Sequence, residues 1–124
     1  MTETEIKKIL KAIEDGTIYK DSRYTSWRKR IFKRDGYQCQ FVGCKYKYGT
    51  LNAHHIWMKW YNPELIYKAR NGITLCTYHH NYVHKKGSDK YIEKFEAIAE
   101  KNGKKGRIIR KKIVKPRKKR RKKR

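Results

Sequence analysis

Residues 71–84 read NGITLCTYHHNYVH, and this stretch decides the expected fold. Asn71-Gly72 predicts a turn, residues 73–75 a short strand, and residues 77–84 a helix without proline or glycine. Cys76 and His79, spaced C-x2-H, stand where the strand ends and the helix begins. His80 and His84 are four residues apart and share a different face of the same helix. One helix is therefore expected to contribute ligands to two metal ions.

A second pair of ligands lies upstream, where Cys39 and Cys44 are spaced C-x4-C across a turn. Together with Cys76 and His79 they predict a closed tetrahedral shell of three thiolates and one imidazole around a structural zinc ion. The alternative is three buried free thiols and an unrelated histidine. Three cysteines cannot form a complete set of disulfides, so metal-bound thiolates in a reducing, intracellular setting are the better fit.

The remaining histidines predict a second site with a different task. His54 and His55 end the stretch LNAHH within residues 51–56, where neighbouring side chains of a strand point in different directions. One of them is therefore suited to bind a metal ion while the other takes a proton. A single histidine is more often an ordinary core or surface residue, but all five lie between His54 and His84. This clustering favours the functional interpretation.

The rest of the chain predicts an α+β fold. Helices are expected over residues 4–15, over residues 26–34 with Ser26 as the cap, and over residues 91–101. Residues 37–56 predict short strands around a turn, and residues 57–70 a loop. Trp57, Trp60 and Tyr61 in this loop either line a binding cleft or cover the core, with at least one tryptophan expected in the core.

The charge of the chain predicts a polyanionic partner. The formal net charge is +24, and fifteen of the thirty-five Lys and Arg residues lie in the acid-free stretch 104–124. Nucleic acid is the commonest partner of such a chain, and no segment is apolar enough to predict a membrane span. The alternative is a solvated charge run. Candidate phosphate contacts in the body and the tail are Arg28, Lys33, Arg34, Lys118 and Arg120.

The motifs closely resemble those of the HNH endonucleases. The segments WRKRIFKRDGYQCQFVGC (27–44), LNAHHI (51–56) and NGITLCTYHHNYVH (71–84) match in order and spacing over about half the chain. They look most like the small phage and prokaryotic members with zinc-knuckle cysteines. The resemblance implies a ββα-metal (His-Me finger) core, in which a two-stranded ribbon and one helix hold the catalytic ion.

The resemblance also implies a role for each residue that matches the motif. His55 corresponds to the general base, and Asn71 to the asparagine that holds the loop orienting it. The Asn71 side-chain carbonyl is one candidate for fixing the His55 tautomer, and a backbone carbonyl is the other. Ligands of the catalytic ion are expected to be His54, His80 and, as an additional member, His84. Two spacings depart from the family, because its first cysteine pair is usually C-x2-C and His79 replaces a cysteine in the second.

The expected function is therefore hydrolysis of DNA phosphodiester bonds by a single-metal mechanism, with nicking and double-strand cleavage both open. Imidazole ligands favour Zn, Ni, Mn or Co over Mg as the catalytic ion. The resemblance suggests a phage terminase as a partner and the cytoplasm of a host cell as the location, and leaves monomer and homodimer open. The main alternative is a non-catalytic zinc-finger protein that binds DNA or RNA.

Four regions are expected along the chain. They are an N-terminal helix and connector (1–22), the nuclease core with its zinc knuckle (23–88), a C-terminal helix (89–103), and a flexible basic tail that binds DNA (104–124).

Overall fold

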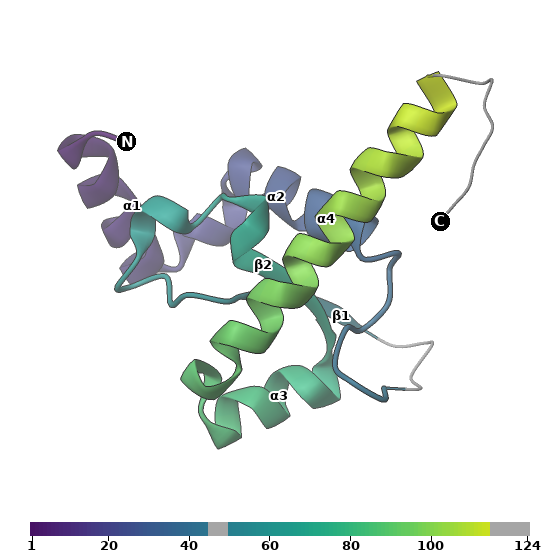
Figure 1. The fold of residues 1–124 in the computed structure, drawn as a ribbon. Helices are drawn as coiled ribbons and strands as arrows, with labels where there is room; N and C mark the ends of the chain where they lie inside the picture. Colours follow the sequence, from purple (N-terminus) through teal and green to yellow (C-terminus); the bar gives the residue numbers. More distant parts are fainter. Residues whose placement is uncertain (45–49, 115–124) are drawn as a thin grey trace.

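The computed structural model describes residues 1–44 and 50–114, with side chains up to residue 104. The predicted tail residues Lys118 and Arg120 lie outside the described residues. The fold is mixed α+β, as predicted, and is shown in Figure 1. The helices and strands are α1 (Glu3–Asp15), α2 (Ser22–Arg34), β1 (Leu51–His55), β2 (Gly72–Cys76), α3 (Thr77–Lys86) and α4 (Ile92–Val114). Four short 3-10 helices join them: η1 (Thr17–Lys20), η2 (Pro63–Leu65), η3 (Ala69–Asn71) and η4 (Ser88–Tyr91).

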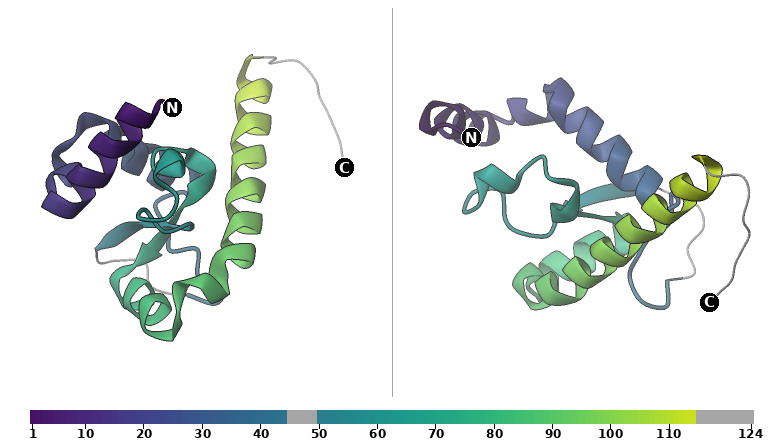
Figure 2. Two further views of the ribbon diagram at one scale, coloured as in Figure 1. Left: turned by 90° about the vertical axis from the view of Figure 1, so that its left-hand side faces the viewer. Right: turned by 45° about the horizontal axis from the view of Figure 1, so that its top comes forward.

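The two strands form an antiparallel ribbon between helices. His54 of β1 is opposite Ile73 of β2, and His55 is opposite Gly72. Helix α2 covers one face of the ribbon, while α3 and the first part of α4 cover the other (Figures 1 and 2). Because side chains alternate along a strand, His54 points towards α3 and His55 towards α2. The pleat of β1 thus separates the two adjacent histidines.

Two apolar clusters hold this arrangement. The larger one joins the ribbon to α3 and α4, and consists of Ile56, Ile73, Leu75, Val83, Phe95 and Ala99. The smaller one consists of Ile9, Ile18 and Ile66, each at most 2% exposed. This smaller cluster fastens α1 to the segment between the strands, because Ile66 lies immediately after η2.

Helix α2 begins four residues earlier than the sequence predicted. Its N-cap is Asp21, whose Oδ1 accepts a hydrogen bond from the backbone N–H of Arg23 at 2.8 Å. Ser26 lies inside the helix. A carboxylate both accepts the free N–H groups and complements the positive end of the helix dipole, so Asp21 is the stronger cap.

The strand predicted around residues 37–41 is absent from the described part of the chain. Tyr37 has a positive φ of 57°. The Gln40 N–H donates to the Thr74 carbonyl of β2 at 2.9 Å, but this segment is not assigned as a strand. The alternation of Tyr37, Cys39 and Phe41 along this segment therefore does not reflect a strand. Phe41 stacks on His79, with ring centroids 4.2 Å apart, so this segment packs against the first turn of α3.

Helix α4 continues through Gly103, where the sequence predicted its end. A glycine inside a helix costs only about 1 kcal/mol relative to alanine and does not stop the helix by itself. The side chain of Asn102, one residue earlier, donates to Asp35 Oδ1 at 2.9 Å and to Gln40 Oε1 at 3.0 Å. These bonds tie this turn of α4 to the body, and the helix extends beyond the body (Figure 2).

Candidate metal centres and catalytic cavity

The first candidate metal centre brings together the four residues predicted to bind zinc. The ligand atoms of Cys39, Cys44, Cys76 and His79 all lie within 4.8 Å of one another. His79 Nδ1 is 3.3 Å from Cys76 Sγ and 3.6 Å from Cys39 Sγ. A tetrahedral zinc ion with ordinary Zn–S and Zn–N bonds has sulfur–nitrogen and sulfur–sulfur edges of about 3.5–3.8 Å. The group is therefore compatible with a metal ion such as zinc, despite the unusual C-x4-C spacing.

Local structure explains why this group forms. Cys76 ends β2 and is also the N-cap of α3, with its sulfur accepting a hydrogen bond from the His79 N–H at 3.4 Å. Gly43 takes a left-handed φ of 80° in the turn that precedes Cys44. Burial raises the pKa of the Cys39 thiol to about 12. A cation at this position would reverse that preference, because a coordinated thiol loses its proton.

The second candidate metal centre consists of His54, His80 and His84. One ring nitrogen from each lies within 4.8 Å of the others, and the Nε2 atoms of His80 and His84 are 3.2 Å apart. Two imidazole nitrogens on one tetrahedral ion are about 3.3 Å apart, so the pair has the spacing of two ligands. His54 comes from β1, and the other two from successive turns of α3. Such a set of imidazoles suits zinc and the later first-row divalent ions.

The surroundings of His54 give the strongest indication that this cluster suits a cation. Its side chain is 2% exposed, and its Nε2 is buried with no hydrogen-bond partner among the described residues. Burial, together with the nearby His84 and His80, lowers its pKa to about 3. A buried polar atom without a partner is costly. A cation held by the three imidazoles would satisfy it.

His55 is held as a neutral imidazole with a defined tautomer. Its Nε2 lies 3.0 Å from the carbonyl oxygen of Ile66. A carbonyl only accepts, so Nε2 carries the hydrogen and Nδ1 keeps the lone pair. The ring stacks on Trp27 with an interplanar angle of 9°. Burial lowers the pKa of His55 to about 4, and Lys59 contributes to the decrease, while the bond to Ile66 opposes it.

Among the residues that the structure describes, the hydrogen bonds of the Asn71 side chain go to the loop and not to His55. Its Oδ1 accepts from the Trp57 N–H at 2.7 Å, and its Nδ2 donates to the Leu65 carbonyl at 3.2 Å. The side chain is 2% exposed. Of the two sequence-based candidates for fixing the His55 tautomer, the backbone carbonyl is therefore the one present. Asn71 closes the segment that delivers this carbonyl.

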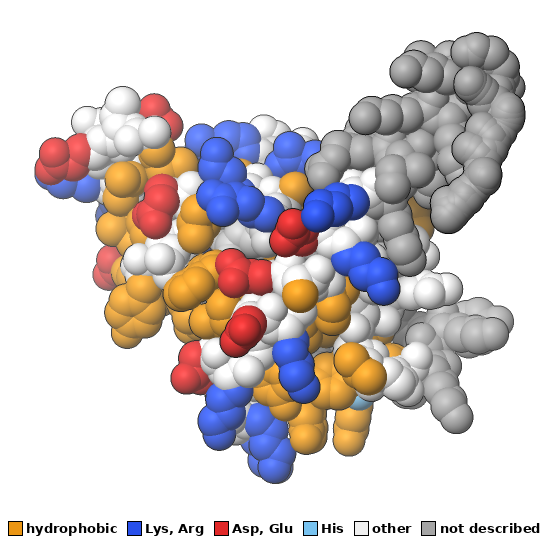
Figure 3. Space-filling model, in the orientation of Figure 1, with side chains coloured by type: hydrophobic (Ala, Val, Ile, Leu, Met, Phe, Trp, Pro, Cys, Tyr) orange, Lys and Arg blue, Asp and Glu red, His pale blue; other side chains and the backbone are white. Residues whose placement is uncertain are grey.

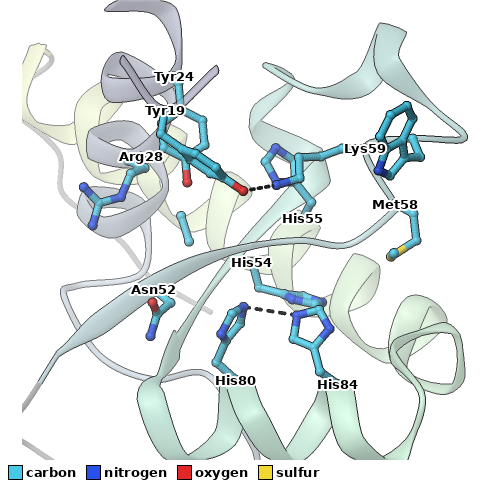
Figure 4. A pocket seen from close by; sticks show the side chains of 12 residues that line it. Tyr19, Tyr24, Arg28, Asn52, His54, His55, Met58, Lys59, His80 and His84 are labelled. Atoms are coloured by element: carbon cyan, nitrogen blue, oxygen red, sulfur yellow. Dashed lines mark hydrogen bonds between the residues drawn. The ribbon is translucent and has the colours of Figure 1, made fainter. Parts of the chain in front are cut away.

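One cavity of about 620 Å³ joins His55 to the three-histidine cluster (Figure 4). His55 lies on the α2 side of β1, while His54, His80 and His84 lie on the α3 side. The thiolate group is not part of its lining. The lining residues are Tyr19, Tyr24, Arg28, Asn52, Ala53, His54, His55, Met58, Lys59, Trp60, His80 and His84.

The three basic residues predicted on α2 lie in different places. Arg28 lines the cavity, and Lys33 is exposed. Arg34 is a correction: its side chain is only 11% exposed and donates to the carbonyls of Ala69 and Gly72 at 2.8 and 2.7 Å. Its guanidinium also pairs with Asp35. Its donors are used inside the fold, so it is not a phosphate contact.

Two residues that affect the site indirectly, Asp35 and Lys59, were not predicted from the sequence. Asp35 was not among the predicted residues, yet its buried carboxylate accepts hydrogen bonds from Arg34, from the Thr74 N–H and from Asn102. Lys59 was not predicted to be in the site, although its charge lowers the pKa of both His55 and His80. A buried acid beside a buried arginine leaves no periodic signal in a sequence. A lysine in a loop leaves none either.

On the face drawn in Figure 3, basic side chains are mixed with other kinds. Lysine and arginine side chains lie at the top over the α2 region and at the bottom where α3 lies, with acidic and hydrophobic side chains between them. Within residues 1–44 and 50–114, no helix is both long and apolar enough to cross a bilayer.

Comparison with protein-family models, curated proteins and solved structures gave no match to this chain.

Proposed function

We propose that this chain is a metal-dependent endonuclease of the HNH type, with a ββα-metal core, that hydrolyses DNA phosphodiester bonds. One observation carries the proposal. The neutral ring of His55 and the cluster of His54, His80 and His84 face one cavity from opposite sides of β1. A proton acceptor beside a cation site is what hydrolysis of a phosphodiester requires. The ribbon followed directly by α3 agrees with the fold that the motifs imply.

The proposed chemistry begins at His55. Nδ1 accepts a proton from a water molecule, whose oxygen forms the new bond to phosphorus while the bond to the leaving oxygen of the sugar breaks. The Ile66 carbonyl keeps Nε2 protonated, so the free lone pair is always on Nδ1. A divalent cation bound by His54, His80 and His84 would supply positive charge to the phosphate and the leaving oxygen. Arg28 and Lys59 line the same cavity and would offset further phosphate charge.

The Cys39, Cys44, Cys76 and His79 group is proposed to hold a structural zinc ion. It is separate from the cavity and offers four protein ligands, which leaves no open position for substrate. A small body gains stability from such an ion, because binding free energy adds to the free energy of folding.

The deciding experiment is a nicking assay on supercoiled plasmid with added divalent cations. The wild-type protein is expected to convert plasmid to the nicked or linear form, and excess chelator to stop it. His55→Ala is expected to lower the cleavage rate by about 10²–10⁴-fold while DNA binding stays near the wild-type level. Undiminished cutting by His55→Ala would exclude the mechanism. Tight DNA binding without metal-dependent cutting by the wild-type protein would favour a non-catalytic zinc-finger protein.

A further inference from the structure

The cavity is larger than the cutting of one bond requires. Pockets of about 300–1,000 Å³ in proteins hold whole small molecules, and this one has about 620 Å³. A phosphate group and one cation fill only part of that space. The three-histidine cluster takes the part of the cavity on the α3 side of β1, whereas Tyr19, Tyr24 and Arg28 line the part on the α2 side (Figure 4). This second part is aromatic and cationic.

Trp60 and Lys59 belong to the same lining and come from the loop that follows β1. Lys59 Nζ donates to the hydroxyl of Tyr19 and lies 4.7 Å from the centre of its ring. Trp60 is 49% exposed, although burial of an indole is favourable. The sequence analysis expected at least one tryptophan of this loop in the core, and neither Trp57 nor Trp60 is there.

The loop holds Trp60 in place without burying it. The Asn62 N–H donates to the Met58 carbonyl at 3.0 Å, which closes a turn around residues 58–62. Trp57 anchors the start of the loop, because its indole Nε1 donates to Glu96 of α4 at 2.9 Å and its backbone N–H donates to Asn71. The indole of Trp60 is thus presented to the cavity from an anchored turn.

Resting on the proposed nuclease function, we propose that this part of the cavity binds an unstacked nucleotide beside the bond that is cut, so that the preferred substrate is DNA with single-stranded character. An aromatic side chain stacks on a base of any identity, and such stacking contributes about 1–3 kcal/mol per base. Arg28 and Lys59 supply charge for the flanking phosphates. In an intact duplex each base is already stacked, and unstacking one costs a few kcal/mol.

The test measures binding in the His55→Ala background, so that no cleavage occurs. The probes are one fluorescein-labelled single strand of mixed sequence and the blunt duplex of the same sequence, compared by anisotropy at one salt concentration. Adding Trp60→Ala is expected to weaken single-strand binding about tenfold and to leave duplex binding unchanged. Trp60→Phe keeps an aromatic face and is expected to retain most of the affinity.

Tyr61→Ala is the matched control. Tyr61 is adjacent, is 82% exposed and does not line the cavity, so its loss is expected to change neither affinity. Equal weakening of single strand and duplex by Trp60→Ala, or no weakening of single-strand binding, would overturn the inference. Binding needs no catalysis. A protein that never cuts DNA would therefore refute the proposed function, while the binding data would still show whether Trp60 contributes to single-strand affinity. Conversely, a protein that cuts gapped and intact duplexes at equal rates would refute the substrate preference alone.

Discussion

The imidazole of His55 lies flat against the indole of Trp27, with ring centroids 4.0 Å apart. The indole is itself fixed, because its Nε1 donates to the Lys68 carbonyl at 2.9 Å and it is fully buried. Trp27 therefore sets the plane of the His55 ring, and the Ile66 carbonyl sets its rotation. The orientation of the proposed base thus depends on Trp27, the first residue of the segment 27–44, and on Ile66, which lies outside the three segments that resemble the family.

The contact between Trp27 and β2 leads to the first prediction. A Cβ added at Gly72 would lie 2.6 Å from Trp27 Cζ2 and 2.7 Å from Ile31 Cδ1. Both side chains are fully buried. Gly72→Ala is expected to lower the free energy of unfolding by about 1–3 kcal/mol, as overpacking does. Urea denaturation measures this, and an unchanged midpoint would show that Trp27 does not need the close approach.

The two metal centres are expected to be separable by substitution. The wild-type protein should contain two ions per chain when saturated. The double variant His80→Ala/His84→Ala should keep one ion and lose only a modest part of its stability, because the cavity cluster is lost while the thiolate group remains. Cys76→Ser should lose the other ion and unfold at a markedly lower temperature, because a structural ion contributes to folding. Elemental analysis and thermal unfolding are the measurements.

Asn81→Ala provides the control for the metal experiment. Asn81 is exposed on α3 between the ligands and belongs to neither cluster. Its substitution should leave both ions in place. Loss of both ions together in every histidine variant would mean that the two clusters are not separate sites.

The buried pair of Arg34 and Asp35 predicts a large loss of stability. Asp35→Ala would leave the Arg34 guanidinium, only 11% exposed, without its charge partner and the Thr74 N–H without its acceptor. Breaking a buried ion pair in this way costs about 3–5 kcal/mol. Lys33→Ala, at an exposed neighbouring position, should change the urea midpoint little. Equal effects from the two substitutions would argue against the inward-facing role of Arg34.

Acidification is expected to destabilise the protein through His54 and His55. Burial lowers their pKa values from 6.5 to about 3 and about 4. Between these values and pH 6.5 the unfolded chain binds more protons than the folded one, so the free energy of unfolding falls as the pH falls. A cation on the cluster does not change the sign, because protons compete for the same nitrogen atoms. The urea midpoint measured from neutral pH to about pH 4 should follow this decline.

The double variant His54→Gln/His55→Gln separates this cause from other acid effects. It lacks both buried imidazoles, so its urea midpoint should depend less on pH across the same interval. An identical slope in the wild-type protein and the variant would contradict the assignment to these two residues.

The basic C-terminal residues are expected to bind phosphates without reading sequence. Removing residues 115–124, which include Lys118 and Arg120, should weaken DNA binding and reduce the dependence of affinity on salt concentration. Anisotropy titrations at several salt concentrations give the slope. A change in the preferred cleavage sequence after truncation would contradict this role.

The sequence predicted the parts of the structure that depend on local patterns. Helical spacing predicted α1 and α3, and the short apolar run predicted β2. The paired spacings also predicted the two groups in which the seven proposed ligands lie together, because each pair lies within one turn or one helical face. Those pairs needed no long-range information.

Long-range contacts account for what the sequence did not predict. The carbonyl that orients His55 belongs to Ile66, eleven residues later, and any carbonyl looks alike in a sequence. Arg34 resembled a surface cation because its neighbours are basic, and only the fold shows the carbonyls of Ala69 and Gly72 beside it. Gly103 resembled a helix end, whereas Asn102 attaches that turn to the body.

His79 and His80 are consecutive residues of α3 that belong to different ligand clusters. Each residue of an α-helix adds a rotation of about 100° and a rise of about 1.5 Å. Inserting or deleting a single residue of α3 before His79 would therefore turn both histidines away from their ions at once. An insertion between His79 and His80 would misplace at least one of these two histidines. The stretch from Cys76, the N-cap of α3, to His84 is consequently expected to tolerate substitutions between its ligand positions in the course of evolution but no change of length.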